Sequence, residues 1–214
     1  LQRFPLFPDE LALAKLAALL VLPPILLWLT LFPFQGTTCL WAKEGCVLTP
    51  AFLWAAKDWG VIYLLLTLWQ QYPVLYTHSA AAILSAVGLT TAVISGVLAF
   101  RQSSAFAVLA CAAMSELGIV LQGLTTRSGQ GLYSSLMLLI NRSVAVLLAA
   151  SALTALHSIA AGDTEGSTSS TRWQRLLALI AFAVGVLALA GIPPFAGFSA
   201  RRYIYGTLQT EGPY

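Results

Sequence analysis

The sequence has few charged residues and few of the side chains that build soluble active sites. Only 9% of its 214 residues are charged, whereas soluble domains carry about 25%. Its two histidines and three cysteines do not have the spacing of a metal site. It also lacks a glycine-rich phosphate loop and a basic arm, which argues against a nucleotide site and a nucleic-acid surface. We therefore expect no metal, no cofactor and no nucleic-acid partner.

Apolar residues are what the sequence has in excess. They make up 58% of the chain, and the mean hydropathy is +0.82. A transmembrane helix needs about 20 mostly apolar residues. The composition predicts an all-α, polytopic membrane protein with about six transmembrane helices and a short continuation helix over Phe195–Leu208. The six predicted spans are Leu11–Phe32, Pro50–Trp69, Ser79–Phe100, Ala105–Leu124, Leu132–Leu156 and Trp173–Gly191.

Two adjacent prolines, Pro193 and Pro194, interrupt the end of the last apolar run, and Arg201 follows them. Proline lacks a backbone N–H and clashes with the preceding turn, so the pair predicts a broken final helix. Lipid cannot bond the freed backbone groups, so such a break is tolerated inside protein or beside a water-filled cavity. Charge at membrane depth is costly and usually functional. This stretch therefore predicts a broken helix beside an ion pathway.

Lys57 and Asp58 lie within the second apolar run. A membrane-embedded lysine can take up and release a proton, which suits it to an ion pathway. The alternative is that both side chains extend to a membrane interface. Apolar sequence on both sides favours an embedded Lys57. Because adjacent residues lie on different helix faces, we expect only one of the two to point along a pathway.

Glu116 is the one acid near the middle of a predicted span, and Arg142 lies well inside another. A buried carboxyl can exchange protons with a pathway. It can equally form a structural contact between helices, for which Ser115 is a neighbouring donor. Arginine effectively keeps its proton, so Arg142 can tune or gate a pathway but cannot carry a proton itself. The simplest role for Arg142 is as counter-ion of Glu116.

Three other segments have a local interpretation. The mixed loop Phe34–Leu48 contains Cys39 and Cys46, which are either thiols or a disulfide in an oxidising compartment. The polar segment Ser158–Thr171 is typical of a flexible linker. The small residues of Gly88–Gly96 favour close packing of membrane helices, with a water wire as the alternative.

Four motifs occur in a fixed order along the chain. They are Gly88-Leu-Thr-Thr-Ala with Leu98-Ala-Phe-Arg-Gln102, Leu109-Ala-Cys-Ala-Ala-Met-Ser-Glu-Leu-Gly118, Leu139-Ile-Asn-Arg-Ser143, and Gly191-Ile-Pro-Pro-Phe-Ala-Gly-Phe198. The series resembles the antiporter-like membrane subunits of respiratory complex I and of the related multi-subunit cation/proton antiporters. The last motif is most similar to the subunit 2 type of NADH dehydrogenase.

The resemblance covers roughly Thr49 to Tyr205 and implies a division of the chain. Residues 1–48 would form a kinked N-terminal transmembrane helix and a loop. Residues 49–208 would form an antiporter-like helix bundle, which looks like the second of the family's two inverted repeats without its final helices. Residues 209–214 would be a C-terminal tail.

The resemblance also implies which residues form a proton pathway. Lys57 matches a family lysine that follows a Thr-Pro turn. Phe106 stands where a second family lysine would fall, and Arg201 stands where a third would fall. Glu116 occupies a position that is often histidine in the family. The implied pathway residues of this chain are Lys57, Glu116, Arg201, Arg142 and Asp58.

The function implied by the resemblance is that of a membrane-arm subunit of NADH:ubiquinone oxidoreductase. Such a subunit takes part in redox-driven proton translocation and carries no redox cofactor of its own. The expected partners are other membrane-arm subunits, lipids and a separate chain that supplies the N-terminal half of the fold. The expected location is the mitochondrial inner membrane, with a bacterial plasma membrane as the alternative.

Two other functions stay open at this point. The chain could be a structural remnant that maintains the membrane arm without pumping, which Phe106 favours and Lys57 and Glu116 oppose. It could also be a component of a secondary cation/proton antiporter, which shares the same fold.

Overall fold

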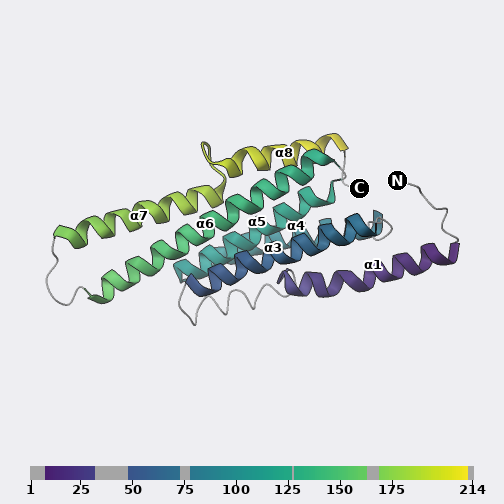
Figure 1. Cartoon of the computed structure of the whole chain (residues 1–214). Coiled ribbons are helices and arrows are strands. Elements are labelled where there is room, and N and C mark those ends of the chain that lie inside the picture. Colours follow the sequence, from purple (N-terminus) through teal and green to yellow (C-terminus); the bar gives the residue numbers. More distant parts are fainter. Residues whose placement is uncertain (1–7, 32–47, 73–77, 127, 163–168, 212–214) are drawn as a thin grey trace.

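The structure is a computed structural model that describes residues 8–31, 48–72, 78–126, 128–162 and 169–211. These residues form seven α-helices and no strand, which confirms the all-α prediction. Figure 1 shows the helices side by side in one elongated bundle, with α1 at one edge and α8 at the opposite edge. The helices are α1 (Pro8–Trp28), α3 (Leu48–Gln71), α4 (His78–Ala99), α5 (Ala105–Thr125), α6 (Gly129–Gly162), α7 (Ser169–Ala190) and α8 (Ala196–Glu211).

Five helices in the described part of the chain are long and apolar enough to cross a membrane. They coincide with five of the six predicted spans, and the chain is a polytopic membrane protein. Of the span predicted over Leu11–Phe32, α1 covers the part up to Trp28, and its described side chains include the apolar stretch Leu19–Trp28. The five full-length spans are Leu48–Gln71, His78–Ala99, Ala105–Thr125, Gly129–Ala160 and Arg172–Ala190.

Helix α6 is longer than the sequence predicts at both of its ends. The predicted span was Leu132–Leu156, whereas α6 runs from Gly129 to Gly162. The polar segment predicted as a linker is therefore partly helical, since α7 also begins within it, at Ser169. At 1.5 Å per residue α6 is about 50 Å long, against about 30 Å for the hydrocarbon core of a bilayer. At least one end of α6 thus extends beyond the lipid tails.

Helix α5 is the most enclosed of the five spanning helices. In its membrane-length stretch 72% of the residues are buried, against 28% in α4 and 22% in α7. Leu117 and Leu121 of α5 are fully buried in one apolar core with Leu138 and Leu139 of α6. A polar side chain on α5 is therefore remote from lipid and must find its partners on neighbouring helices.

The close approach of α4 and α5 depends on two glycines. A side-chain carbon on Gly88 would lie 2.9 Å from the carbonyl oxygen of Gly118, and one on Gly118 would lie 2.8 Å from the amide nitrogen of Ala92. Neither position has room for a methyl group. Ser115 donates a hydrogen bond of 2.9 Å to the carbonyl of Ala92 across the same contact. The packing role predicted for this small-residue segment is confirmed at Gly88.

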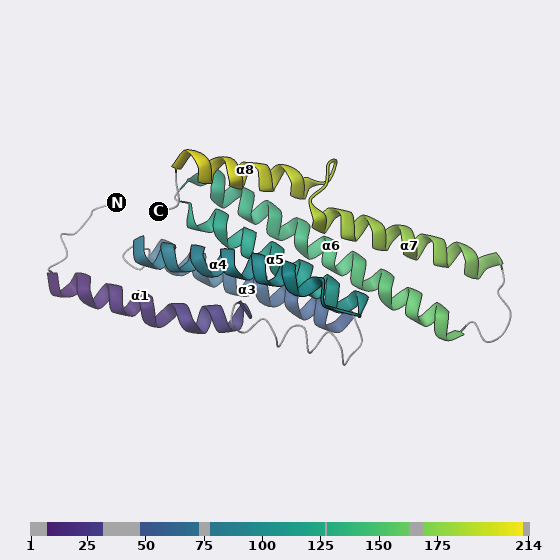
Figure 2. The same cartoon turned by 180° about the vertical axis from the view of Figure 1, so that it is seen from behind.

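The chain leaves helical geometry between α7 and α8, where the two prolines predict it. Helix α7 ends at Ala190 and α8 begins at Ala196. Gly191, just past the end of α7, has a φ of +66°, a left-handed conformation that glycine adopts without a steric penalty. Beyond the break, α8 runs beside the first part of α6, and both views show it at the edge of the bundle (Figure 2).

Candidate functional site

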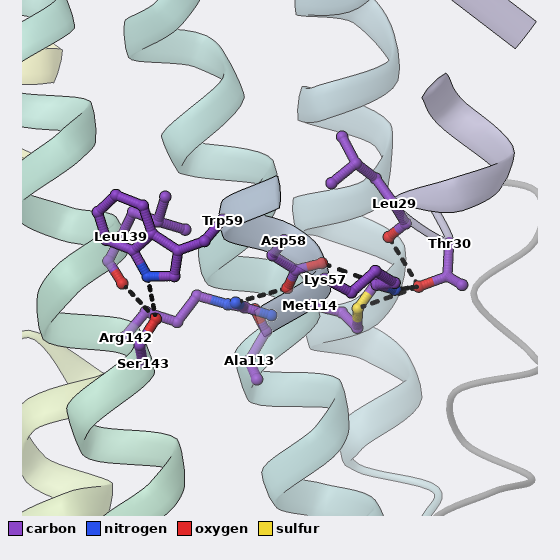
Figure 3. A network of polar contacts seen from close by, with 10 residues as sticks. All are labelled: Leu29, Thr30, Lys57, Asp58, Trp59, Ala113, Met114, Leu139, Arg142 and Ser143. Atoms are coloured by element: carbon purple, nitrogen blue, oxygen red, sulfur yellow. Dashed lines mark hydrogen bonds and ion pairs between the residues drawn. The ribbon is translucent and has the colours of Figure 1, made fainter. Parts of the chain in front are cut away.

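An ion pair between α3 and α6 lies at the centre of a first group of buried polar residues. Arg142 Nη1 is 2.7 Å from Asp58 Oδ2, and the two side chains are 2% and 1% exposed. Arg142 Nε also donates a hydrogen bond of 2.8 Å to the carbonyl oxygen of Ala113 on α5. A buried ion pair needs such additional bonds to offset the loss of hydration. Helices α3, α5 and α6 are thereby joined at this point (Figure 3).

Lys57 joins this group from the other side of Asp58. Its Nζ lies 3.6 Å from Asp58 Oδ1 and donates a hydrogen bond of 3.3 Å to Thr30 Oγ1 at the end of α1. We call Thr30, Lys57, Asp58 and Arg142 the Lys57–Arg142 cluster. Both residues thus belong to the cluster, and the expectation that only one of them points along a pathway stays a prediction. Asp58 faces α6, whereas the longer Lys57 side chain extends toward α1 and still contacts Asp58 (Figure 3).

Thr30 is a member of this cluster that the sequence did not single out. Its φ is +54°, which is uncommon and costly for a β-branched residue. Its hydroxyl donates to the carbonyl of Leu29 at 2.7 Å, so its oxygen lone pairs are left to accept from Lys57. The same oxygen lies 3.8 Å from the sulfur of Met114. A single threonine beside a helix end carries no sequence signal that could have identified it.

The second group of buried polar residues joins α5 to α8. Glu116 Oε1 lies 3.0 Å from Arg201 Nη2, and the side chains are 0% and 20% exposed. The other carboxylate oxygen, Oε2, is buried and has no hydrogen-bond partner among the described residues. A cavity of about 540 Å³ between α4, α5 and α7 reaches both side chains, with mostly apolar walls that include Ile119 and Phe182. We call Glu116 and Arg201 the Glu116–Arg201 cluster.

These pairings correct the prediction that Arg142 is the counter-ion of Glu116. Arg142 pairs with Asp58, and Glu116 pairs with Arg201. Neighbouring residues on α6 point in different directions, so Asn141 contacts α7 while Arg142 contacts α3 and α5. Tertiary packing decides which helices lie next to α6, and the sequence pattern does not predict those neighbours.

Arg201 also bonds the backbone that the two prolines leave without donors. In an uninterrupted helix the N–H groups of residues 193 and 194 would donate to the carbonyls of Leu189 and Ala190. Proline has no N–H to donate. Arg201 Nη1 donates to the Ala190 carbonyl at 2.7 Å, and Nη2 donates to the Leu189 carbonyl. The guanidinium thus replaces both of the missing donors.

Asn141 and two glycines complete the break. Asn141 Nδ2 donates a hydrogen bond of 3.1 Å to the carbonyl of Ala188. A side-chain carbon on Gly191 would lie 2.7 Å from Arg201 Nη1, and one on Gly197 would lie 2.7 Å from Asn141 Nδ2. Both glycines therefore leave the space that these two side chains occupy. In the Gly-Ile-Pro-Pro-Phe-Ala-Gly motif, the prolines leave the carbonyls without donors and the glycines leave space for the side chains that bond them.

Phe106 lies in an apolar core and not beside either cluster of charges. It is 4% exposed and stacks on Trp54 of α3, with ring centroids 5.7 Å apart and an angle of 11° between the rings. The family resemblance implies a lysine at this position. In this chain the position contributes to packing between α3 and α5.

The two clusters lie on either side of one turn of α5. Arg142 bonds the carbonyl of Ala113, and Glu116 follows Ala113 by three residues, which is slightly less than one helical turn. A row of ionisable groups thus crosses the bundle from Lys57 to Arg201 at the level of the middle of α5. Lysine and carboxylate groups can gain and lose protons, whereas the two arginines can orient and neutralise them.

Other titratable residues lie away from this row or outside the described residues. His78 and His157 are exposed, and Cys111 is buried in α5. No group of three histidine, cysteine or acidic side chains in the described ranges could hold a metal ion. Cys39 and Cys46 lie outside those ranges. The expectations of no metal and no cofactor stay predictions.

Curated relatives of the chain are named as subunits of quinone oxidoreductases. It is 30% identical over 139 residues to NAD(P)H-quinone oxidoreductase subunit 2 of a Synechococcus strain, which is 64% of this chain and 26% of the relative. It is 29% identical over 185 residues to NADH-quinone oxidoreductase subunit N of Chromohalobacter salexigens, which is 82% of this chain and 37% of the relative. The chain thus spans between about a quarter and a little over a third of the length of these relatives.

No solved structure matches the chain significantly. The family comparison is more extensive, because residues 12–212 match a family model and the match includes the part before Thr49 where the motifs fade. The broken helix, the row of membrane-embedded charges and this match agree with one another. The chain belongs to the NADH:quinone oxidoreductase/Mrp antiporter transmembrane family.

Proposed function

We propose that this chain is a membrane-arm subunit of a proton-translocating NADH:quinone oxidoreductase and takes part in redox-driven proton movement. The observation that carries the proposal is the row of buried ionisable groups from Lys57 to Arg201 across the middle of the bundle. Charged groups at this depth are costly, and membrane proteins retain them mainly where they serve transport. The names of the relatives favour coupling to quinone reduction over a free-standing antiporter.

In this proposal Lys57 Nζ and Glu116 Oε2 are the atoms that take up and release protons. Lys57 Nζ donates a hydrogen bond to Thr30 and lies 3.6 Å from Asp58 Oδ1, which has no hydrogen-bond partner among the described residues. When Lys57 is neutral, Asp58 keeps its ion pair with Arg142. Glu116 Oε1 is held by Arg201 while Oε2 is left without a hydrogen-bond partner in the described structure, next to the cavity. Arg142 and Arg201 orient these groups and keep their own protons.

The proposed partners are those of a subunit within a larger membrane assembly. In this proposal a separate chain supplies the N-terminal half of the fold, and other membrane-arm subunits and lipids surround both; the relatives are subunits of quinone oxidoreductases. The redox cofactors would be bound by other subunits. The relatives named above are bacterial, which fits a bacterial plasma membrane, and the mitochondrial inner membrane stays a prediction.

The structural remnant is the second candidate, and a specific observation favours it. Both carboxylates of the row are paired with arginine, and Arg201 is also engaged by the backbone of the helix break. Phe106 fills the position of a family lysine with an aromatic stack. In this second proposal the charges join helices within the membrane arm and carry no protons.

Replacement of Lys57 by methionine in the intact complex separates the two candidates. Methionine keeps the length of the side chain and removes the proton-binding nitrogen. Proton uptake by membrane vesicles is measured against NADH oxidation, with Arg175→Met on the exposed surface of α7 as the control. Proton movement falls in Lys57→Met and is unchanged in the control if the chain pumps. Normal pumping by a fully assembled Lys57→Met complex would support the remnant.

Co-purification tests the third candidate, a secondary antiporter. A free-standing antiporter would transport sodium without any NADH-linked partner. Recovery of flavin and iron–sulfur subunits with the chain would exclude it.

A further inference from the structure

Helix α8 carries two adjacent arginines that face in different directions. Arg201 faces inward and pairs with Glu116, which lies near the middle of α5. Arg202 is exposed on the outer side of α8. Because consecutive residues rise by 1.5 Å along a helix, Arg202 leaves α8 at nearly the same depth as Arg201. A positive charge therefore stands on the outside of the bundle at the level of its middle.

Arg202 belongs to a polar stripe along the outer side of α8. Ser199, Arg202, Gly206 and Thr210 follow one another at helical spacing and are all exposed. Together with Gln130 of α6 they line a hollow of about 540 Å³. We call these five residues the outer face of α8.

The opposite side of the same helix is apolar and buried, with Ala200 and Ile204 4% and 0% exposed. Figures 1 and 2 both show α8 at the edge of the bundle, next to α6 and with no labelled helix on its other side. Within the described parts of the chain no carboxylate forms an ion pair with Arg202. A guanidinium facing lipid tails at this depth is strongly unfavourable.

We propose that the outer face of α8 is a docking surface for a transmembrane helix of another subunit that carries an aspartate or glutamate at the depth of Arg202. Charge complementarity points to the acid, because a guanidinium and a carboxylate form the strongest directional pair available away from water. Ser199 and Gly206 allow close approach of a second helix, and a carbon added to Gly206 meets no atom within 4 Å. Thr210 and Gln130 offer further hydrogen-bonding groups.

Two other occupants fit the outer face less well. A second copy related by twofold symmetry would use the same patch on both molecules, so two Arg202 side chains would come close to each other. Lipid head groups carry phosphate but lie at the membrane surfaces, away from the middle of the bundle. The inference requires only that the bundle spans a membrane, and it holds whether or not the chain moves protons.

Photo-crosslinking in the native membrane tests the occupant with Arg202 left in place. A benzoylphenylalanine replaces Tyr203, which lines the hollow and is 53% exposed. The control replaces Val97 on α4, which is 58% exposed. We expect the Tyr203 adduct to join a membrane helix of another chain that has an acid within about one turn of the cross-linked residue. Adducts with lipid alone, with a second copy of this chain or with a helix that lacks an acid would overturn the proposal.

A charge exchange then tests the ion pair itself. Arg202→Glu places two acids together and is expected to lower recovery of the cross-linked chain on the order of tenfold. Arg202→Lys retains the charge and most of the recovery, and Arg175→Glu on α7 serves as the control. Replacement of the partner's acid by arginine restores recovery with Arg202→Glu. Full recovery of Arg202→Glu without any change in the partner would show that the acid does not pair with Arg202.

Discussion

The two clusters of buried charge use arginine in different ways. In the Lys57–Arg142 cluster, Arg142 bonds a carboxylate and one carbonyl of α5, a helix that is intact at that point. In the Glu116–Arg201 cluster, Arg201 bonds a carboxylate and two carbonyls that lost their donors to proline. The first arginine joins three helices, whereas the second also completes the end of a broken helix. Two arginines at the same depth thus have different structural roles.

This difference bears on Arg201, which stands where the family resemblance implies a lysine. Arg201 distributes its hydrogen bonds over two nitrogen atoms, Nη1 and Nη2. A lysine presents its three donors from one nitrogen and lacks the planar fork of arginine. The helix break therefore offers a structural reason for arginine at position 201 that is independent of proton transport.

The largest expected effect comes from removing the arginine of the Lys57–Arg142 cluster. Arg142→Met leaves Asp58 buried with Lys57 as its remaining partner, at 3.6 Å. Loss of one member of a buried ion pair costs about 3–5 kcal/mol of stability. A thermal unfolding series of the purified complex would measure this as a lower melting temperature. The double variant Asp58→Asn with Arg142→Met removes the unpaired charge and should recover part of the loss; if it does not, the pair is not the cause.

Arginine-to-lysine substitution compares the two clusters directly. Arg201→Lys keeps the charge beside Glu116 but leaves one of the carbonyls of Leu189 and Ala190 without a donor, which costs about 1–3 kcal/mol. Arg142→Lys gives up the bond to Ala113, whose carbonyl retains its own helical hydrogen bond within α5. We expect the melting temperature to fall further for Arg201→Lys. Equal or opposite ranking of the two variants would contradict the role of Arg201 at the break.

Gly191→Ala tests whether the guanidinium needs the space beside the break. Alanine at a φ of +66° costs about 1–2 kcal/mol, and its added carbon would lie 2.7 Å from Arg201 Nη1. We expect a lower melting temperature together with reduced proton movement per NADH, because Glu116 loses its fixed partner. Gly129→Ala is the control, since Gly129 lies at the start of α6 and an added carbon there meets no atom within 4 Å. A similar loss in both variants would mean that the effect is general to glycine replacement.

The smallest expected effect is at Thr30. Thr30→Val preserves the shape of the side chain but removes two hydrogen bonds, the one accepted from Lys57 and the one donated to the Leu29 carbonyl. Each costs about 1 kcal/mol. We expect a clear loss of proton movement per NADH with only a small change in melting temperature, because the substitution is confined to the neighbour of Lys57. Thr30→Ser keeps the hydroxyl and should retain proton movement. Unchanged proton movement in Thr30→Val would remove Thr30 from the pathway.

The sequence predicted most of the fold, because a bilayer imposes a simple length requirement on its helices. Five of the six predicted spans are observed, and the break lies at Pro193 and Pro194. The predictions are less accurate at helix ends in polar sequence, such as the extension of α6 to Gly162. Hydropathy marks where a helix leaves the lipid, but it does not mark where the helix itself ends. Of the span predicted over Leu11–Phe32, α1 covers the part up to Trp28.

The sequence by itself determined that the chain crosses a membrane, that its last helix is broken, and that ionisable residues are embedded in its spans. These properties depend on residue type and on distance along one helix. Only the tertiary structure decided that Asp58 and not Glu116 pairs with Arg142, and that Arg201 bonds the carbonyls of the broken helix. Such pairings join residues as many as 85 positions apart. They depend on which faces of the helices meet, and that is set by the packing of the whole bundle.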